Sequence, residues 1–165
     1  MTRYKATTEG MIPFTAEEEA IADADENLFL LERVEKLKGR KINELTDMFN
    51  IESSSPVIFN GDTFHGGLNS AQMANGKSDM ISRLVAGGET NTADSISTFN
   101  DIKRNTVRMT ADDMKSLSLT IALNYEYAYR IKTAVAIDID SLSTVEDINN
   151  FNVRDEWNKK LAEFG

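Results

Sequence analysis

The chain has 165 residues, of which 41% are hydrophobic and 27% are charged, and it contains no cysteine. This composition supports a folded core, and it excludes disulfides, iron–sulfur clusters, cysteine-based zinc sites and cysteine nucleophiles. The formal net charge is −9 and the pI is near 4.7. A surface of this charge repels nucleic-acid phosphates, so we expect no nucleic-acid partner. No apolar run has membrane-spanning length and no secretory leader is evident, so we also expect no membrane association.

Residues 1–14 show no hydrophobic period and predict an extended arm. A long helix is predicted over residues 15–52, where Thr15 can cap the N-terminus and Glu18 completes a capping box. Apolar side chains recur every seven residues along this helix in two rows, which is typical of a coiled coil. The rows are Ile21, Leu28, Ile42 and Phe49, and Ala24, Leu31 and Leu45.

This heptad pattern has two interpretations. Glu35 and Lys38 interrupt the rows, and Gly39 lowers helix propensity at the same place by about 1 kcal/mol. The helix could therefore pack on the chain's own domain, or it could form a coiled coil between identical chains, with the opposite charges of the interruption paired across them. For the second interpretation, the predicted oligomer or partner interface consists of Ile21, Leu28, Leu31, Ile42, Leu45 and Phe49.

The stretch VIFNGDTFHGG, residues 57–67, predicts a β-hairpin. Asn60-Gly61 supplies the positive φ angles of a type I′ turn. In that register Val57 faces Phe64, and the two side chains form one apolar patch. An isolated hairpin is marginally stable in water, so it must pack on a helix or on a neighbouring chain.

A second helix is predicted over residues 69–88, ended by two glycines. Its expected buried side carries Met73, Met80, Ile81 and Leu84. A polar loop over residues 88–97 then leads to a strand pair around Phe99, Ile102 and Val107.

A third helix is predicted after Thr110, which caps it together with Asp113. Its apolar residues recur at spacings of three and four, and they are Met114, Leu117, Ile121, Tyr125, Ala128, Ile131 and Val135. Ser143 and Glu146 predict a further capping box, and Trp157 is expected in the core. The predicted fold is α+β and helix-dominant, with an arm at 1–14, a helix at 15–52 and a small α+β domain at 56–165.

No pattern in the sequence predicts a catalytic site. His65 is the only histidine, so a zinc site there would need three carboxylates, and a polar loop role or a cross-chain hydrogen bond is favoured. Asp138 and Asp140 begin a calcium-loop-like stretch, but Leu142 and Ser143 occupy positions that need an oxygen ligand and a glycine. We therefore expect no metal, no cofactor and no enzymatic activity.

Two regions resemble proteins of tailed bacteriophages. "YKATTEGMIPFTAEEEA" is similar to the leader of tail-fibre assembly proteins, and the remainder resembles the phage domain of unknown function 4376. The matching stretches of the remainder are "FNGDTFHGG", "NSAQMANGKSDMISRLVAGG", "TVRMTADDMKSL" and "KTAVAIDIDSLSTVEDINNF". The family's aspartate-rich stretch after the hairpin is replaced here by "HGGLNSAQ".

The resemblance implies a non-enzymatic structural protein of the virion, associated with the tail or tail fibre and assembled in the host cytoplasm. Its implied partners are other phage tail proteins and further copies of itself, with a trimer preferred because fibre-type phage proteins are commonly threefold. The family offers no catalytic residues to transfer.

Two alternatives stay open at this point. The first is a tail-fibre assembly chaperone, which would be absent from the mature particle. The second is a glycan-processing or receptor-binding enzyme, for which the sequence offers no defined pair of acids.

Overall fold

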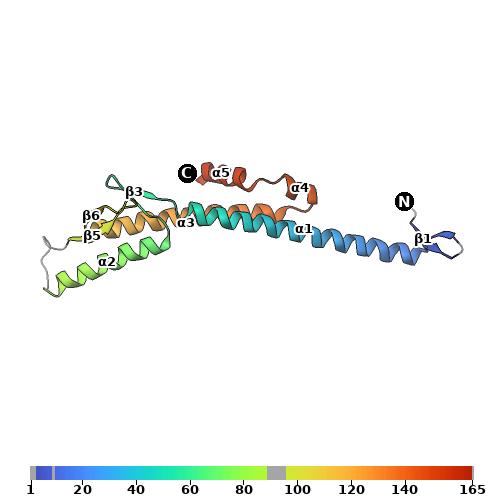
Figure 1. Ribbon diagram of the computed structural model, residues 1–165, viewed down its shortest axis with the longest axis horizontal. Coiled ribbons are helices and arrows are strands. Elements are labelled where there is room, and N and C mark those ends of the chain that lie inside the picture. The colour runs from blue at the N-terminus through green and yellow to red at the C-terminus, as the bar shows by residue number, and fades with distance from the viewer. Residues whose placement is uncertain (1–2, 9, 89–95, 165) are drawn as a thin grey trace. The chain divides into compact units, whose positions relative to one another are not determined.

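The computed structural model describes residues 3–8, 10–88 and 96–164, and within these it has five helices and three antiparallel strand pairs (Figure 1). The predicted fold class, helix-dominant α+β, is confirmed. In chain order the elements are β1 (Tyr4–Thr7), β2 (Gly10–Pro13), α1 (Ala16–Glu52), β3 (Val57–Phe59), β4 (Asp62–Phe64), α2 (Leu68–Ala86), β5 (Ile96–Asn100), β6 (Thr106–Thr110), α3 (Ala111–Ser141), α4 (Val145–Asn150) and α5 (Val153–Phe164).

The chain forms two compact units, one from residues 1–43 and 138–151, and the other from residues 44–137 and 152–165. Helices α1 and α3 each contribute residues to both units. The sequence suggested a division into consecutive segments instead, and whether 56–165 folds alone stays a prediction.

The first unit begins with a hairpin in place of a single extended arm. Residues 4–7 and 10–13 are extended, as expected, but they form β1 and β2, which pair antiparallel, with Tyr4 opposite Pro13 and Thr7 opposite Gly10. The capping box at the start of α1 is confirmed, since the Thr15 amide donates to Glu18 at 2.9 Å and the Glu18 amide donates to the Thr15 hydroxyl at 3.3 Å.

Within this same unit, two lysines of α1 donate to carbonyl oxygens at the ends of later helices. Lys38 Nζ donates to the Asp140 carbonyl in the last turn of α3, and Lys41 Nζ donates to the Phe151 carbonyl at the C-cap of α4, both at 2.7 Å. Helix C-termini leave carbonyls without intrahelical partners and carry partial negative charge, so a cation there is stabilising.

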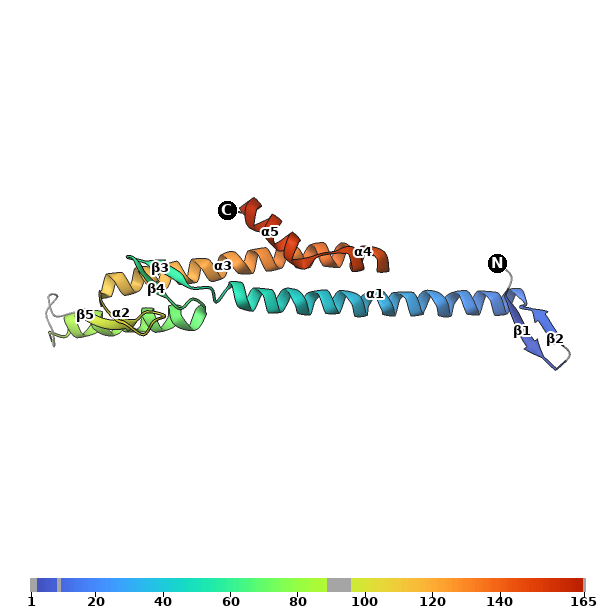
Figure 2. The ribbon, with the colours of Figure 1, turned by 45° about the horizontal axis from the view of Figure 1, so that its top comes forward.

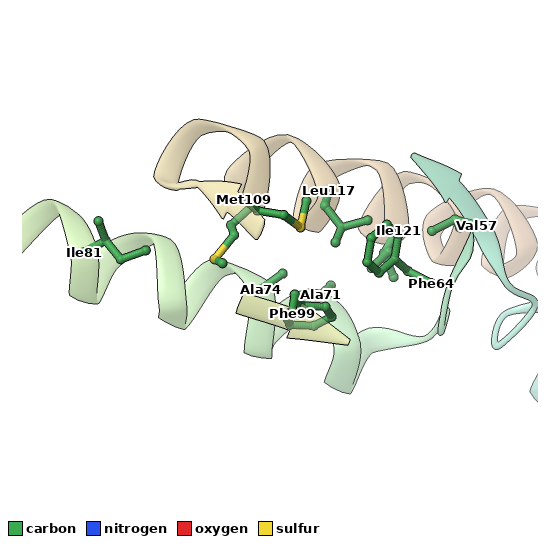
Figure 3. Packing of buried hydrophobic residues seen from close by; sticks show 10 residues of the cluster. Val57, Phe64, Ala71, Ala74, Ile81, Phe99, Met109, Leu117 and Ile121 are labelled. Atoms are coloured by element: carbon green, nitrogen blue, oxygen red, sulfur yellow. The ribbon is translucent and has the colours of Figure 1, made fainter. Parts of the chain in front are cut away.

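The second unit is organised around the β3–β4 hairpin, whose predicted register is confirmed. Val57 pairs with Phe64 across the strands, and Asn60 and Gly61 have φ angles of 50° and 88°. Phe64 is fully buried, and Figure 3 shows it beside Ile121 of α3. The core cluster consists of Val57, Phe64, Ala71, Ala74, Ile81, Phe99, Met109, Met114, Leu117 and Ile121.

The predicted apolar row of α3 is confirmed. Six of its seven members are buried, and Tyr125 is half-buried. Thr110 and Asp113 form the expected capping box, in which the Asp113 amide donates to the Thr110 hydroxyl at 3.1 Å. Trp157 is buried, as expected.

The capping residue of α4 was predicted one position too early. Thr144, and not Ser143, caps this helix, and the Asp147 amide donates to its hydroxyl at 3.0 Å. Each hydroxyl has an acid three residues later, so the sequence offered two equivalent boxes. The structure uses the second.

The buried side of α2 was predicted wrongly for its methionines. Met73 and Met80 are 61% and 52% exposed, whereas the helix buries Ala71, Ala74, Ser78 and Ile81. Two hydroxyl bonds explain this orientation. Ser78 Oγ donates to the Ala111 carbonyl, and Ser118 Oγ donates to the Ala71 carbonyl, both at 2.8 Å. These bonds require α2 and α3 to approach closely, which small side chains allow.

The predicted strand pair is confirmed as β5 and β6, with Phe99 opposite Val107. Ile102 lies in the connection and its amide donates to the Thr63 carbonyl at 2.9 Å, which joins this pair to β4. The predicted polar loop ends earlier than expected, because β5 begins at Ile96; residues 89–95 lie outside the described residues.

We expect Gly61→Val to destabilise the second unit by roughly 1–3 kcal/mol, because a β-branched residue is strained at a φ of 88°. A Cβ at Gly61 meets nothing within 4 Å, so the loss would come from the backbone alone. Thermal unfolding followed by circular dichroism should show a lower melting temperature. An unchanged value would contradict the turn assignment.

Gly66→Ala should be at least as damaging, for a different reason. A Cβ at this position would lie 2.1 Å from the Ser55 carbonyl oxygen, so the backbone would have to move, at a cost of about 2 kcal/mol or more. The matched control is Gly76→Ala in α2, where a Cβ meets nothing within 4 Å and helix propensity should add roughly 0.5–1 kcal/mol of stability. Equal melting temperatures for the two variants would refute the close approach.

Candidate functional site

Figure 2 shows the β1–β2 hairpin at the N-terminal end of α1. Arg3, which immediately precedes β1, attaches the hairpin to acids on the first turns of this helix. Its guanidinium donates to Asp23 at 2.5 Å, to Glu26 at 2.6 Å and to Glu19 at 3.2 Å, and its backbone amide donates to Glu19 at 2.8 Å. These acids are spaced by four and three residues, so they share one face of the helix. The hydrogen bond to Asp23 raises the pKa of Arg3. We call this arrangement the Arg3 clamp.

Lys5 adds a second attachment on a neighbouring face of α1. Its ammonium bonds the Glu18 carboxylate, the same group that accepts from the Thr15 amide. The bond from Lys5, followed by that from Thr15, lowers the pKa of Glu18. A depression of about 300 Å³ lies beside this contact. It is lined by Lys5, Phe14, Glu18, Ile21, Ala22 and Asp25.

Two turns further along α1, four consecutive apolar side chains are exposed. Leu28, Phe29, Leu30 and Leu31 are 57%, 63%, 43% and 63% exposed. Successive residues of a helix are about 100° apart, so these four side chains surround the helix instead of forming one stripe. We call them the apolar turn.

The structure places the predicted interface residues in two different environments. Ile21, Leu28 and Leu31 are exposed, and Ile42 is half-buried. Leu45 and Phe49 are buried within the second unit. The heptad rows therefore serve the chain's own core at one end and remain open at the other, and association between chains stays a prediction.

The packing of Phe49 shows how the C-terminal end of the rows is used. Its ring lies edge-on to Tyr125 with centroids 5.5 Å apart and to Tyr129 with centroids 6.2 Å apart, and Lys132 Nζ lies 4.8 Å from its centre. Such aromatic and cation–π contacts add to simple burial. The interruption at Lys38 also has a use within the chain, because this side chain bonds the Asp140 carbonyl.

His65 lies at a separate hollow of about 320 Å³ in the second unit. The hollow is lined by His65, Ser70, Met73, Lys77, Phe99 and Asn100. The Lys77 ammonium lies 5.2 Å from the centre of the Phe99 ring. No carboxylate is among these described lining residues, so the hollow does not assemble a serine–histidine–acid arrangement.

Comparisons with known proteins add no identification. No protein-family model matches the chain, and no curated protein or solved structure gives a significant match. The resemblance to phage tail proteins therefore rests on the quoted stretches alone. Among the described residues, no helix is long and apolar enough to span a membrane, and no three His, Cys, Asp or Glu side chains group as metal ligands.

Sequence reasoning proposed an interface along the whole of the heptad rows without separating the exposed part from the buried part, and it missed the Arg3 clamp. The available signal was two basic residues, Arg3 and Lys5, two positions apart in a segment that precedes a run of acids. Such a pair points to the same side of a strand. Recognising the clamp required knowing that β1 and β2 pair, and no hydrophobic alternation in this segment predicts those strands.

Replacing Arg3 by Gln should loosen the hairpin without unfolding the protein. Exposed ion pairs contribute little to global stability, so the melting temperature should stay within about 2 °C while amide hydrogen exchange in β1 and β2 accelerates. Arg33→Gln is the control, because Arg33 is exposed on the same helix and outside the clamp. Unchanged exchange in Arg3→Gln would show that the clamp does not hold the hairpin.

Acidification should have a related effect in the wild-type chain. Because the pKa of Glu18 is lowered, its contribution is fully present above the ordinary glutamate pKa, roughly 4.3, and is lost as the pH falls through the lowered value. The protection of the β1 amides, measured as exchange relative to the intrinsic rate at each pH, should therefore fall at acidic pH, and Glu18→Gln should remove Glu18's share of that fall. A Glu18→Gln profile identical to the wild-type profile would contradict this assignment.

Proposed function

We propose that the chain is a non-enzymatic structural component of a tailed-phage virion, associated with the tail or tail fibre, that acts through protein–protein assembly. The observation that carries this proposal is the apolar turn of α1. Four large apolar side chains stand exposed on a helix whose start is fixed by a hairpin and a capping box.

The energetics of the apolar turn favour a partner. Covering the exposed parts of its four side chains would contribute on the order of 3–6 kcal/mol. The helix is already formed and its first turns are held, so little backbone entropy would be lost on binding. Exposed apolar patches of this kind mark interaction surfaces in soluble proteins.

Among the described residues, the polar groups that bond one another also support a structural role. Thr15, Thr110 and Thr144 are used with acids three residues later to begin helices. Arg3 and Lys5 attach the hairpin. These charges and hydroxyls hold the architecture that presents the apolar turn.

The phage setting is supported by the sequence resemblance described above. Within it, we propose other tail proteins and further copies of the chain as partners, with three copies preferred. Mass spectrometry of purified particles of the phage that carries the sequence tests the setting. A stoichiometric amount of the chain is expected. Its presence in the lysate and absence from particles would favour the assembly chaperone and contradict a virion component.

Association through the heptad rows can be tested with two matched double variants. Leu28→Asp with Leu31→Asp places two carboxylates per chain in the rows and should lower the solution mass, measured by light scattering, to that of a monomer. Arg33→Gln with Lys36→Gln changes the net charge by the same amount at two exposed positions outside both the rows and the apolar turn, and it should leave the mass unchanged. Circular dichroism should show both variants folded. A wild-type chain that is monomeric at high concentration would contradict self-association.

A further inference from the structure

We infer that the partner at the N-terminal part of the heptad rows is another copy of this chain, lying parallel and in register. This inference rests on the proposed assembly function and names its partner and geometry. The surface concerned consists of Ile21, Ala24, Leu28 and Leu31, all exposed, and we call it the N-terminal seam. A heptad seam is self-complementary, because the knobs of one copy fit the holes of an identical one.

Contacts within the first unit set where the seam stops. Val34 is buried, and Lys38 is engaged by the Asp140 carbonyl, so the following turns of the same rows are partly occupied by the chain itself. The free stretch runs from about residue 17 to residue 33. At 1.5 Å per residue this is roughly 25 Å of helix, a short coiled coil.

The Arg3 clamp lies on the opposite side of the helix from the seam. Taking about 100° per residue, the mean direction of Glu19, Asp23 and Glu26 is roughly 150° from that of the four seam residues. The hairpin held by the Arg3 clamp therefore does not cover the seam through these contacts. Lys5 and Phe14 line a depression with Ile21, which is still 58% exposed, so a second copy can approach the seam while these ion pairs stay in place.

The hairpin also reduces the repulsion that parallel copies would otherwise suffer. The first three turns of α1 carry six acids and no base: Glu17, Glu18, Glu19, Asp23, Asp25 and Glu26. Arg3 pairs with three of them and Lys5 with a fourth. Parallel chains bring these acidic turns to the same level, and the bound hairpin supplies each copy with its own compensating charge.

The residues that flank the seam decide the orientation. In a parallel pair, the residue just before a first-row residue lies near the residue that follows a second-row residue of the other copy. Ala20 then faces Asp25 and Asn27 faces Glu32, so no like charges meet. In an antiparallel pair that matches the four seam residues, Ile21 lies opposite Leu31 and Ala24 lies opposite Leu28, so Asp25 faces Asp25 of the other copy. A carboxylate pair would then border the middle of a seam only a few turns long, which is unfavourable.

The charge distribution along α1 gives a weaker argument for the opposite orientation. Arg33, Lys36 and Arg40 follow the acidic turns and are exposed, so an antiparallel partner would bring unlike charges to the same level. However, Arg33 and Arg40 point away from the seam, and four of the six acids are already paired within their own chain. The direct contacts at the seam border therefore outweigh this distribution.

Site-specific cross-linking tests the geometry, and the absence of native cysteine makes single-cysteine variants unambiguous. Ala24→Cys in the full chain, oxidised mildly, should form disulfide-linked dimers, because equivalent seam positions of parallel copies face each other within disulfide range. Arg33→Cys, on the outer face, is the control. We expect the dimer yield of Ala24→Cys to exceed that of Arg33→Cys by about tenfold.

An equimolar mixture of Ile21→Cys and Leu31→Cys detects the opposite orientation, because matched antiparallel seams bring these two positions together, whereas parallel copies keep them about 15 Å apart along the helix axis. Mixed dimers, identified by peptide mass spectrometry, would overturn the inference. It is also overturned if light scattering shows an oligomer while Ala24→Cys cross-links no better than Arg33→Cys, or if the chain stays monomeric. The particle measurement is independent of these outcomes, so the proposed virion role can stand or fail separately.

Discussion

The architecture of the second unit depends on the burial of Phe64. The Asn60-Gly61 turn sets the register that places this side chain opposite Val57, and the ring then packs at a centroid distance of 6.0 Å from Phe99. Around it, Figure 3 shows residues of α2 and α3 facing one another. Two hairpins that would be marginal alone are stabilised here because a shared core covers their apolar faces.

The first unit is held together differently: ion pairs attach its hairpin, whereas apolar burial stabilises the hairpins of the second unit. Its hairpin is held by Arg3 and Lys5 against carboxylates, and its helix leaves large apolar side chains in contact with water. One heptad pattern thus has two uses along α1. Where Leu45 and Phe49 stand, the rows complete the chain's own core, and around Leu28 they remain open.

Local chemistry made much of this fold predictable from the sequence. The capping box at Thr110, the Asn60-Gly61 turn and the apolar row of α3 each depend on residues within one or two turns of each other, so the pattern is complete in the sequence. The exposed side of α2 was not predictable, because Ser78 selects it through a bond to a distant helix. The same distinction applies to the candidate surface. Its seam follows a seven-residue period that the sequence shows directly, whereas the Arg3 clamp joins residues up to 23 positions apart and was not predictable.

The bonds from Lys38 and Lys41 have a consequence for how the chain folds. Neither α3 nor α4 has a basic residue in its own last turn, and the cations that meet their final carbonyls come from 102 and 110 positions earlier in the sequence. These final carbonyls therefore receive their lysine donors only after α1 has met the C-terminal ends of α3 and α4. Contacts of such long sequence separation form slowly, because the loop between them must close first. In a chain emerging from the ribosome, α1 would be synthesised long before the carbonyls that its lysines serve, so these two bonds form late in the folding of this unit.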